Sequence, residues 1–396
     1  MNQECVNVAY MGENGKNAFL AKLLGLYNSN NLNTKYHMGA KEEDIVNDFS
    51  NILEDRKSTI DNNMPIIWNF KMDKRNINIY SIDDEINDIF NNALVQCNVG
   101  LFYIKYKTSG KNKLDIGLKN QILLANILGL KSAFVYIDDS NYIPESQDWT
   151  KTINKIRDIF IKKNFKSNRV FIISKFNREC IGDAFKEYFK LESRRKNQND
   201  NYNSVCLPVS NIFPLVNKYY GLNATLIKGS IQLNDFLVNS RNKAVFKIEE
   251  LQVAHKPVDT AYKGNNVGIK LKNASEITRG DILVKKDDVL EYYTILTAQV
   301  LLIDDEFDKN TILSINTIGR DTSVKVVNIQ KTINNLNKTI EKRPESLKKG
   351  DTGIVVLQSR GKLPLKLYSQ DYTLGSFLIK NELEKVIGVG IVKNLK

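Results

Sequence analysis

The feature that most constrains the fold is a change of hydrophobic pattern near residue 192. Up to residue 189, short and nearly continuous apolar runs alternate with longer segments whose apolar residues recur at helical spacing. Strands are expected at 6–11, 66–70, 77–82, 99–106, 133–137 and 170–173, and helices at 18–26, 119–128, 149–161 and 184–191. Nearly continuous apolar strands are covered on both faces, and strands that alternate with helices form parallel sheets. The first part of the chain is therefore predicted to be a doubly wound α/β domain.

The second part of the chain has a different pattern. Residues 192–204 are polar except for one tyrosine, and this segment is predicted to be a linker. Beyond it, short strands follow one another, separated by turns around Gly264, Gly280, Gly350 and Gly361, as in all-β barrels. We place a further boundary in the polar stretch 286–291. The predicted domains are an α/β domain at 1–191, a β-barrel at 205–288 and a second β-barrel at 292–396.

Composition narrows the possible functions. The 57 Lys and Arg residues exceed the 45 Asp and Glu residues, and the net charge of +12 favours a polyanionic partner. The four cysteines include no CxxC pair, and the two histidines are too few for a metal site or catalysis based on several imidazoles. The polar N-terminus and the lack of a ~20-residue apolar stretch predict a cytoplasmic protein without a membrane partner.

A glycine-flanked turn after the first strand is the most informative local motif. Gly12, Glu13, Asn14, Gly15 and Lys16 are followed by Asn17 and a predicted helix. A phosphate-binding loop reads GxxxxGK[ST], because four intervening residues let backbone N–H groups surround the phosphate and the last hydroxyl holds Mg²⁺. Here the loop is two residues shorter and an amide replaces the hydroxyl. Taken alone, the motif fits either an ordinary strand-to-helix turn or a nucleotide site.

Further segments carry a resemblance to one family. They are 59–61 (TID), 128–131 (LGLK), 264–269 (GNNVGI) with 279–281 (RGD), 347–351 (LKKGD), 374–377 (LGSF) and 388–392 (GVGIV). On these segments the chain resembles translational GTPases of the elongation factor 1-alpha and EF-Tu type. The resemblance implies an α/β P-loop-type G domain with a doubly wound sheet, followed by two all-β barrels. It is strongest to the ribosome-rescue GTPase that partners Pelota, with its exosome-adaptor paralogue and the class II release-factor GTPase as near neighbours.

The motifs that such a GTPase needs for chemistry are missing. Where the resemblance implies DxxG, residues 81–84 read SIDD, and where it implies NKxD, residues 138–141 read DDSN. The resemblance therefore implies no catalytic residue, no metal ligand and no expected cofactor, with GTP and Mg²⁺ needed only if the site is active. The expected remnant is a vestigial nucleotide pocket made of Gly12, Gly15, Lys16, Asn17, Thr59, Ser174 and Lys175.

The resemblance and the charge together suggest a function. Lysines and arginines cluster at 105–113, at 194–196 and at Lys162, Lys163, Lys166 and Arg169. We expect a pseudo-GTPase that binds ribosomal RNA at the factor site as a scaffold, rescue or occupancy factor. It is expected to be monomeric, with a Pelota-like or tRNA-shaped adaptor as a further partner. Two alternatives are an active GTP-binding factor that delivers a tRNA or tRNA-like adaptor to the A site, and a non-ribosomal RNA-decay adaptor.

Overall fold

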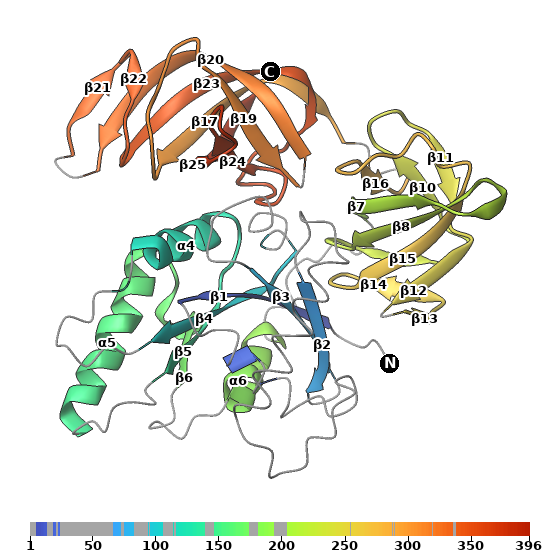
Figure 1. Cartoon of the computed structure of the whole chain (residues 1–396), viewed down its shortest axis with the longest axis horizontal. Helices are drawn as coiled ribbons and strands as arrows, with labels where there is room; N and C mark the ends of the chain where they lie inside the picture. Colours follow the sequence, from blue (N-terminus) through green and yellow to red (C-terminus); the bar gives the residue numbers. More distant parts are fainter. Residues whose placement is uncertain are drawn as a thin grey trace. The chain divides into compact units, whose positions relative to one another are not determined.

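The computed structural model describes residues 5–13, 19–20, 23, 66–72, 75–82, 94, 96–105, 114, 116–138, 146–173, 181–193, 204–253, 255–286, 288, 290–318, 320–335 and 338–396. The chain divides into two compact units, of which one contains most of residues 1–200 and the other all of residues 201–396 (Figure 1). No helix among these residues has the length and apolar character needed to cross a membrane.

The first unit contains a six-stranded sheet in the order β2-β3-β1-β4-β5-β6 (Figure 1). Its strands are β1 (Cys5–Gly12), β2 (Ile66–Met72), β3 (Arg75–Ser81), β4 (Val99–Lys105), β5 (Ala133–Asp138) and β6 (Val170–Ile173). Strand β2 is antiparallel to β3, and the other neighbours are parallel. Every predicted strand lies within two residues of an observed one. The predicted doubly wound α/β fold is confirmed.

Both faces of this sheet are buried, as the continuous apolar runs predicted. Leu101 on β4 belongs to a core with Phe185 of α6 (Ile181–Ser193). The next residue on β4, Phe102, makes edge-on contact with Phe160 of α5 (Ser146–Lys162). Successive side chains on a strand point to opposite faces, so the two helices cover different faces of the sheet. A third helix, α4 (Ile116–Ile127), connects β4 with β5.

Helix α6 ends later than expected. It runs to Ser193, so the first two residues of the predicted linker at 192–204 are helical. The carboxylate of Glu192 forms an ion pair with the guanidinium of Arg169, which is buried. This pair stabilises the last helical turn, which hydrophobic periodicity could not reveal.

The strands of residues 207–284, which we call domain 2, form an eight-stranded sheet in the order β11-β10-β16-β7-β8-β15-β12-β13 and a separate β9–β14 pair. They are β7 (Leu207–Pro214), β8 (Tyr219–Thr225), β9 (Ser230–Gln232), β10 (Phe236–Asn239), β11 (Val245–Lys247), β12 (Glu250–Val253), β13 (Lys256–Pro257), β14 (Thr260–Tyr262), β15 (Asn266–Lys272) and β16 (Ile282–Val284). The sheet curves around a core that includes Leu207, Leu222 and Ile269 (Figure 1).

The strands of residues 292–395, which we call domain 3, include a barrel of six strands. The order β19-β24-β25-β17-β23-β20 is closed by pairing of β19 with β20. The strands are β17 (Tyr292–Leu302), β18 (Phe307–Asp308), β19 (Ile312–Thr317), β20 (Arg320–Asn334), β21 (Ile340–Lys342), β22 (Ser346–Leu347), β23 (Asp351–Pro364), β24 (Ser376–Lys380) and β25 (Val386–Leu395). The barrel encloses its own apolar core, which includes Val300, Val355 and Phe377.

One predicted turn in the β domains is wrong. Gly264, Gly280 and Gly350 have φ angles of 90°, 80° and 85°, as glycine-dependent turns require. Gly361, however, lies inside strand β23. There the register with β17 shifts between Tyr293 and Ile295, so that the extra residues around Gly361 form a bulge.

Candidate nucleotide site

The candidate site lies at the carboxyl ends of β1, β4 and β5. These strands are parallel neighbours, and β1 separates β3, which lies on one side, from β4 on the other. In open α/β sheets, ligands bind outside the carboxyl ends of the strands where the strand order reverses. Of the predicted pocket residues, the structure describes Gly12 at the end of β1. Gly15, Lys16, Asn17, Thr59, Ser174 and Lys175 lie outside the described residues.

Gly12 is in a position that only glycine fits. Its φ angle is 146°, and a Cβ atom there would lie 2.2 Å from the backbone oxygen of Tyr103 on β4. The chain then continues alongside β4: the N–H of Glu13 donates to the Tyr103 oxygen at 3.0 Å. The Glu13 carboxylate in turn accepts the N–H of Lys105 at 2.8 Å. The first residue of the loop therefore uses its N–H and one carboxylate oxygen in contacts with β4.

A tyrosine and an aspartate link the ends of β4 and β5. The hydroxyl of Tyr103 donates a hydrogen bond to the carboxylate of Asp138, the residue at the first position of the expected NKxD motif. Burial of the ring and then the hydrogen bond to Asp138 raise the pKa of Tyr103. Tyr103 is thus a neutral donor throughout the physiological range, and its hydroxyl is directed to the Asp138 carboxylate. An amide that could read a guanine base is absent from this position.

Aromatic rings fill the space beneath these strand ends. Tyr103 and Tyr136 are register partners on β4 and β5, and their nearly parallel rings lie 6.0 Å apart. Phe19, which follows the glycine-rich turn, stacks on Tyr136 with 3.9 Å between ring centroids and lies 6.2 Å from the ring of Tyr10. Tyr10 and Tyr103 are almost fully buried. We call Tyr10, Phe19, Tyr103 and Tyr136 the aromatic cluster.

Sequence reasoning missed the aromatic cluster. Each of its three tyrosines lies inside an expected strand, where an aromatic residue is ordinary core. The available signal was their position, because Tyr10, Tyr103 and Tyr136 all stand two residues before a strand's end. Parallel strands bring such positions together at one edge of the sheet.

The predicted basic clusters are only partly surface features. Lys162 and Lys166 are exposed, and so is Lys105. Arg169, which was predicted to belong to the same cluster, is 5% exposed and pairs with Glu192. Its assignment to an RNA-facing cluster is therefore wrong, because its charge is neutralised inside the unit. Among the described residues, no group of three or more histidine, cysteine, aspartate and glutamate side chains is arranged to hold a metal ion.

Parts of the chain are similar in sequence to known translation factors. Residues 295–393 match the family described as GTP-eEF1A C-terminal domain-like. The chain is 23% identical to elongation factor 1-alpha of Plasmodium falciparum in an alignment of 325 residues, with 76% of this chain and 71% of that protein covered. It is 24% identical to elongation factor 1-alpha of Hyperthermus butylicus over 195 residues, 48% of this chain and 44% of that protein.

Solved structures share the fold at low sequence identity. The GTPase-like domain of S. cerevisiae Ski7, bound to GTP, has a TM-score of 0.67 at 16% identity, with 99% of this chain and 97% of that chain covered. Elongation factor SelB of Methanococcus maripaludis, in complex with a GTP analogue, has a TM-score of 0.63 at 16% identity, with 100% and 80% covered. For the bacterial selenocysteine-specific elongation factor EF-Sec, the TM-score is 0.65 at 12% identity. The match covers 99% of this chain but 59% of that factor. The chain therefore has the fold of the translational GTPases and resembles elongation factor 1-alpha, with a third domain that matches that family's C-terminal domain.

Proposed function

We propose that this chain is an elongation-factor-1-alpha-like pseudo-GTPase that binds the ribosome at its factor site, as a scaffold, rescue or occupancy factor. The observation that carries the loss of nucleotide binding is the carboxyl edge of β1, β4 and β5. There Glu13 and Asp138 bond to groups of β4, and the aromatic cluster lies beneath the strand ends.

The electrostatics of this edge oppose a triphosphate. Phosphate sites depend on free backbone N–H groups and nearby cations. The N–H of Glu13 is already bound to Tyr103, and two carboxylates, Glu13 and Asp138, lie at the same edge. The described residues therefore do not fit GTP and Mg²⁺. A hydrolysis step would also need a clamp on the transferred phosphoryl group, and the one cation among the described residues at these strand ends is Lys105, the register partner of Asp138.

Calorimetry tests this part of the proposal. GTP and GDP with Mg²⁺ are titrated into the full chain, with an active elongation factor 1-alpha as the positive control. We expect no binding tighter than ~10 µM, about −7 kcal/mol. A lower dissociation constant for either nucleotide would overturn the pseudo-GTPase assignment.

A hairpin of domain 2 supports the ribosome as a partner. Residues 213–218, which comprise the end of β7 and the connection to β8, are all exposed, and Val216 is 81% exposed. The neighbouring Tyr219 ring has the ammonium groups of Lys270 and Lys272 at 4.8 and 5.7 Å from its centroid. Aromatic rings beside lysines suit RNA, because rings stack on bases and ammonium groups neutralise phosphates. With the net charge of +12, this surface favours a ribosomal RNA contact.

Co-sedimentation with ribosomes tests the partner. Binding is expected to fall by about two orders of magnitude or more between ~50 and ~200 mM salt, because lysine contacts release counterions from phosphates. Binding that is unchanged across this range would contradict an RNA contact as the main attraction. Absence of binding at low salt would contradict the ribosome as partner and favour the RNA-decay adaptor.

A second candidate function is a GTP-binding factor that delivers a tRNA or tRNA-like adaptor to the A site. One finding favours it: the similar Ski7 GTPase-like domain is bound to GTP in its structure. The calorimetric titration separates this candidate from the first, because only the second requires nucleotide affinity.

A further inference from the structure

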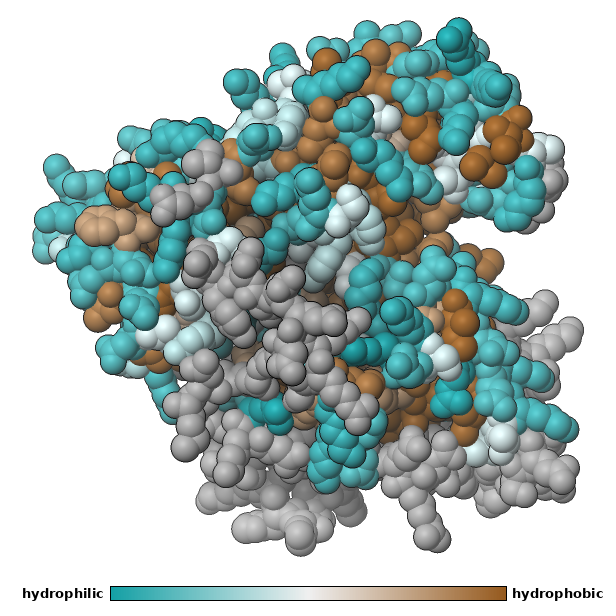
Figure 2. Space-filling model, turned by 180° about the vertical axis from the view of Figure 1, so that it is seen from behind, coloured by the Kyte–Doolittle hydropathy of each residue, from teal (hydrophilic) through white to brown (hydrophobic). Residues whose placement is uncertain are grey.

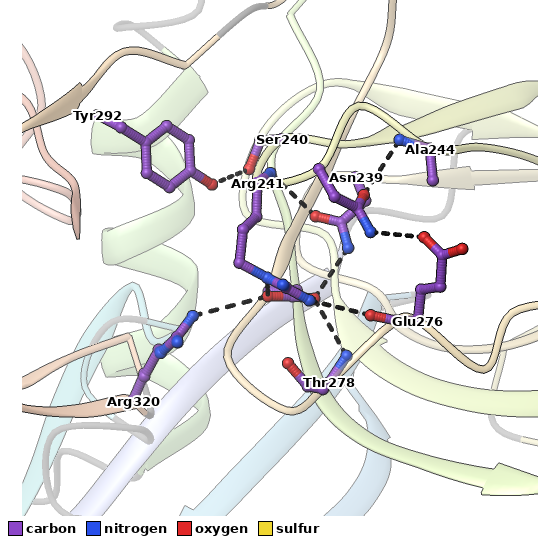
Figure 3. Close-up of polar contacts among 10 residues, drawn as sticks. Asn239, Ser240, Arg241, Ala244, Glu276, Thr278, Tyr292 and Arg320 are labelled. Atoms are coloured by element: carbon purple, nitrogen blue, oxygen red, sulfur yellow. Dashed lines mark hydrogen bonds and ion pairs between the residues drawn. The ribbon is translucent and has the colours of Figure 1, made fainter. Parts of the chain in front are cut away.

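Two buried aspartates lie where domain 2 meets domain 3, within the unit that contains residues 201–396. The first is Asp281 of domain 2, whose side chain is fully buried. Its carboxylate accepts hydrogen bonds from Arg241 at 2.8 and 2.9 Å, from Asn239 at 2.8 Å and from the N–H of Thr278 at 3.1 Å (Figure 3). From domain 3, the guanidinium of Arg320 approaches the same carboxylate at 3.7 Å.

The second aspartate reverses this arrangement. Asp371 belongs to domain 3, and its side chain is 3% exposed. It accepts backbone N–H groups of its own loop, from Thr373 at 3.0 Å and Leu374 at 3.4 Å. Its ion-pair partner is Lys228 of domain 2, whose Nζ lies 2.5 Å from Oδ2. Each domain thus presents one buried carboxylate to a cation of the other.

The two contacts differ in how much they depend on the opposite domain. If the domains separated, Asp281 would still pair with Arg241 of its own domain, so the contact with Arg320 is supplementary. Among the described residues, the cation that pairs with Asp371 comes from across the interface. Removing one partner of a buried ion pair is costly, because the other charge stays buried without compensation. The Lys228–Asp371 contact is therefore the stronger electrostatic tie between the domains.

An apolar cluster also joins the two domains. It contains Ile282 and Val284 of domain 2, and Cys206 immediately before β7, with Ile318 and Leu374 of domain 3. Ile318 has a φ angle of 43°, a left-handed conformation that is strained for a β-branched residue. Because its side chain is buried in this cluster, packing across the interface offsets the strain. Cys206 is 5% exposed in this cluster, so opening of the interface would give solvent access to its thiol.

We propose that the Lys228–Asp371 contact is a releasable lock between the two β domains. While the contact is made, the apolar cluster stays closed and Cys206 is protected. When it is lost, domain 3 separates from domain 2 at this point, and the Asp281 cluster acts as the remaining attachment. The lock uses no nucleotide, so the proposal does not depend on the state of the candidate nucleotide site.

Alkylation of Cys206 tests the lock. The full chain and its Lys228→Ala variant are treated with iodoacetamide at mildly alkaline pH, and the peptide that contains Cys206 is quantified by mass spectrometry. We expect alkylation about tenfold faster or more in the variant, because local opening controls access to a buried group. Lys270→Ala is the matched control. It removes an exposed pair with Glu250 inside domain 2, and the Cys206 rate is expected to stay within about twofold.

Hydrogen exchange separates opening of the interface from unfolding of domain 2. In Lys228→Ala, the peptide that covers β15 is expected to keep its protection, whereas peptides around 204–208 and 371–376 lose theirs. If Lys228→Ala does not fold, Asp371→Asn removes the charge but keeps an oxygen for the Thr373 N–H, and the same results are expected. An unchanged Cys206 rate in a folded variant, equal acceleration in Lys270→Ala, or equal loss of protection in β15 would overturn the proposal.

Discussion

At the residue scale, the ends of β1, β4 and β5 hold the residues that distinguish this chain from the expected motifs. Glu13 and Asp138 could be recognised from sequence as departures from the motifs that bind phosphate and guanine. Tyr103 could not, because its importance comes from register: it lies opposite Gly12 on β1 and opposite Tyr136 on β5. Pairing register is set by the packing of the whole sheet, which the sequence pattern of a single strand does not contain. The degenerate motifs were therefore predictable, and the aromatic cluster beneath them was not.

The first prediction concerns Gly12. In Gly12→Ala, the added Cβ would lie 2.2 Å from the Tyr103 oxygen at a φ angle of 146°. We expect the α/β unit to lose ~2 kcal/mol or more of unfolding free energy. Urea unfolding followed by tryptophan fluorescence measures this unit, because both tryptophans, Trp68 and Trp149, belong to it.

Gly361 provides the matched control for this substitution. A Cβ atom at Gly361 meets no atom within 4 Å. Gly361→Ala is therefore expected to change the unfolding free energy of the β unit, followed by far-UV circular dichroism, by less than ~0.5 kcal/mol. Similar losses for both variants would contradict the close approach of β1 to β4.

The second prediction concerns Asp281 and pH. Burial raises the pKa of this carboxyl group, but hydrogen bonds from Arg241, Asn239 and the Thr278 N–H lower it by more, so the pKa lies below its ordinary value. Such a group stabilises the folded state above its unfolded pKa of about 3.9. That contribution is lost as the pH falls through the folded value.

Scanning calorimetry of Asp281→Asn tests the sign of this effect. At pH 7 we expect the unfolding temperature of the β unit to fall by about 4 °C or more, because a buried, paired carboxylate is removed. At about pH 3 the difference from the parent chain is expected to narrow, because the carboxyl group of the unfolded parent chain, with a pKa of about 3.9, is then largely protonated and this favours unfolding. An equal difference at both pH values would mean that the charge of Asp281 contributes nothing.

At the scale of elements, the hydrophobic pattern predicted which strands and helices are present better than it predicted where they begin and end. The apolar runs predicted every described strand of the α/β sheet, because burial on both faces leaves a continuous signal. The end of α6 was missed, since it depends on the Arg169–Glu192 ion pair. The bulge at Gly361 was read as a turn, because glycine permits both and the pairing of β23 with β17 decides between them. Errors thus fall where a distant residue determines the local structure.

The third prediction concerns the β7–β8 hairpin. Phe213 is 41% exposed, and its ring lies against Gly221, where a Cβ would be 2.3 Å from the ring. One face of the ring thus rests on the backbone of β8. In Phe213→Ser with Lys218→Glu, ribosome affinity is expected to fall about tenfold or more, because a stacking ring and a phosphate contact are both lost. Co-sedimentation at ~50 mM salt measures the loss.

A matched apolar position shows whether this effect is specific. Leu383 of domain 3 is 85% exposed, and Leu383→Ser is expected to leave ribosome affinity unchanged. The hairpin variant should also keep the unfolding temperature of the β unit, because the replaced side chains are exposed. Exposed apolar residues are not unusual in this chain: Figure 2 shows apolar and polar residues intermingled on one face. Equal effects of Leu383→Ser and the hairpin variant would contradict the assignment of this surface.

At the scale of the whole molecule, the chain has the fold of the translational GTPases, whereas its sequence differs from the family at the positions expected for DxxG and NKxD. In nucleotide-driven factors, the γ-phosphate and Mg²⁺ order loops and thereby change the shape of the molecule. A ligand shifts such an equilibrium only by its differential affinity for the two states. A chain that binds no nucleotide must therefore take its binding-competent arrangement from its own contacts, such as those between the β domains.

The last prediction follows from this independence. Lys16 and Thr59 are the residues whose counterparts would hold phosphate and sense it in an active factor, so Lys16→Ala with Thr59→Ala would abolish the function of a working GTPase. In this chain we expect ribosome binding to stay within about twofold of the parent, and added GTP to have no effect on either protein, because a ligand that does not bind shifts no equilibrium. Co-sedimentation at low salt with and without GTP measures both. A large loss that GTP deepens or rescues would mean that the pocket is still used, and the factor would then have to be regarded as nucleotide-dependent despite the aromatic cluster at its strand ends.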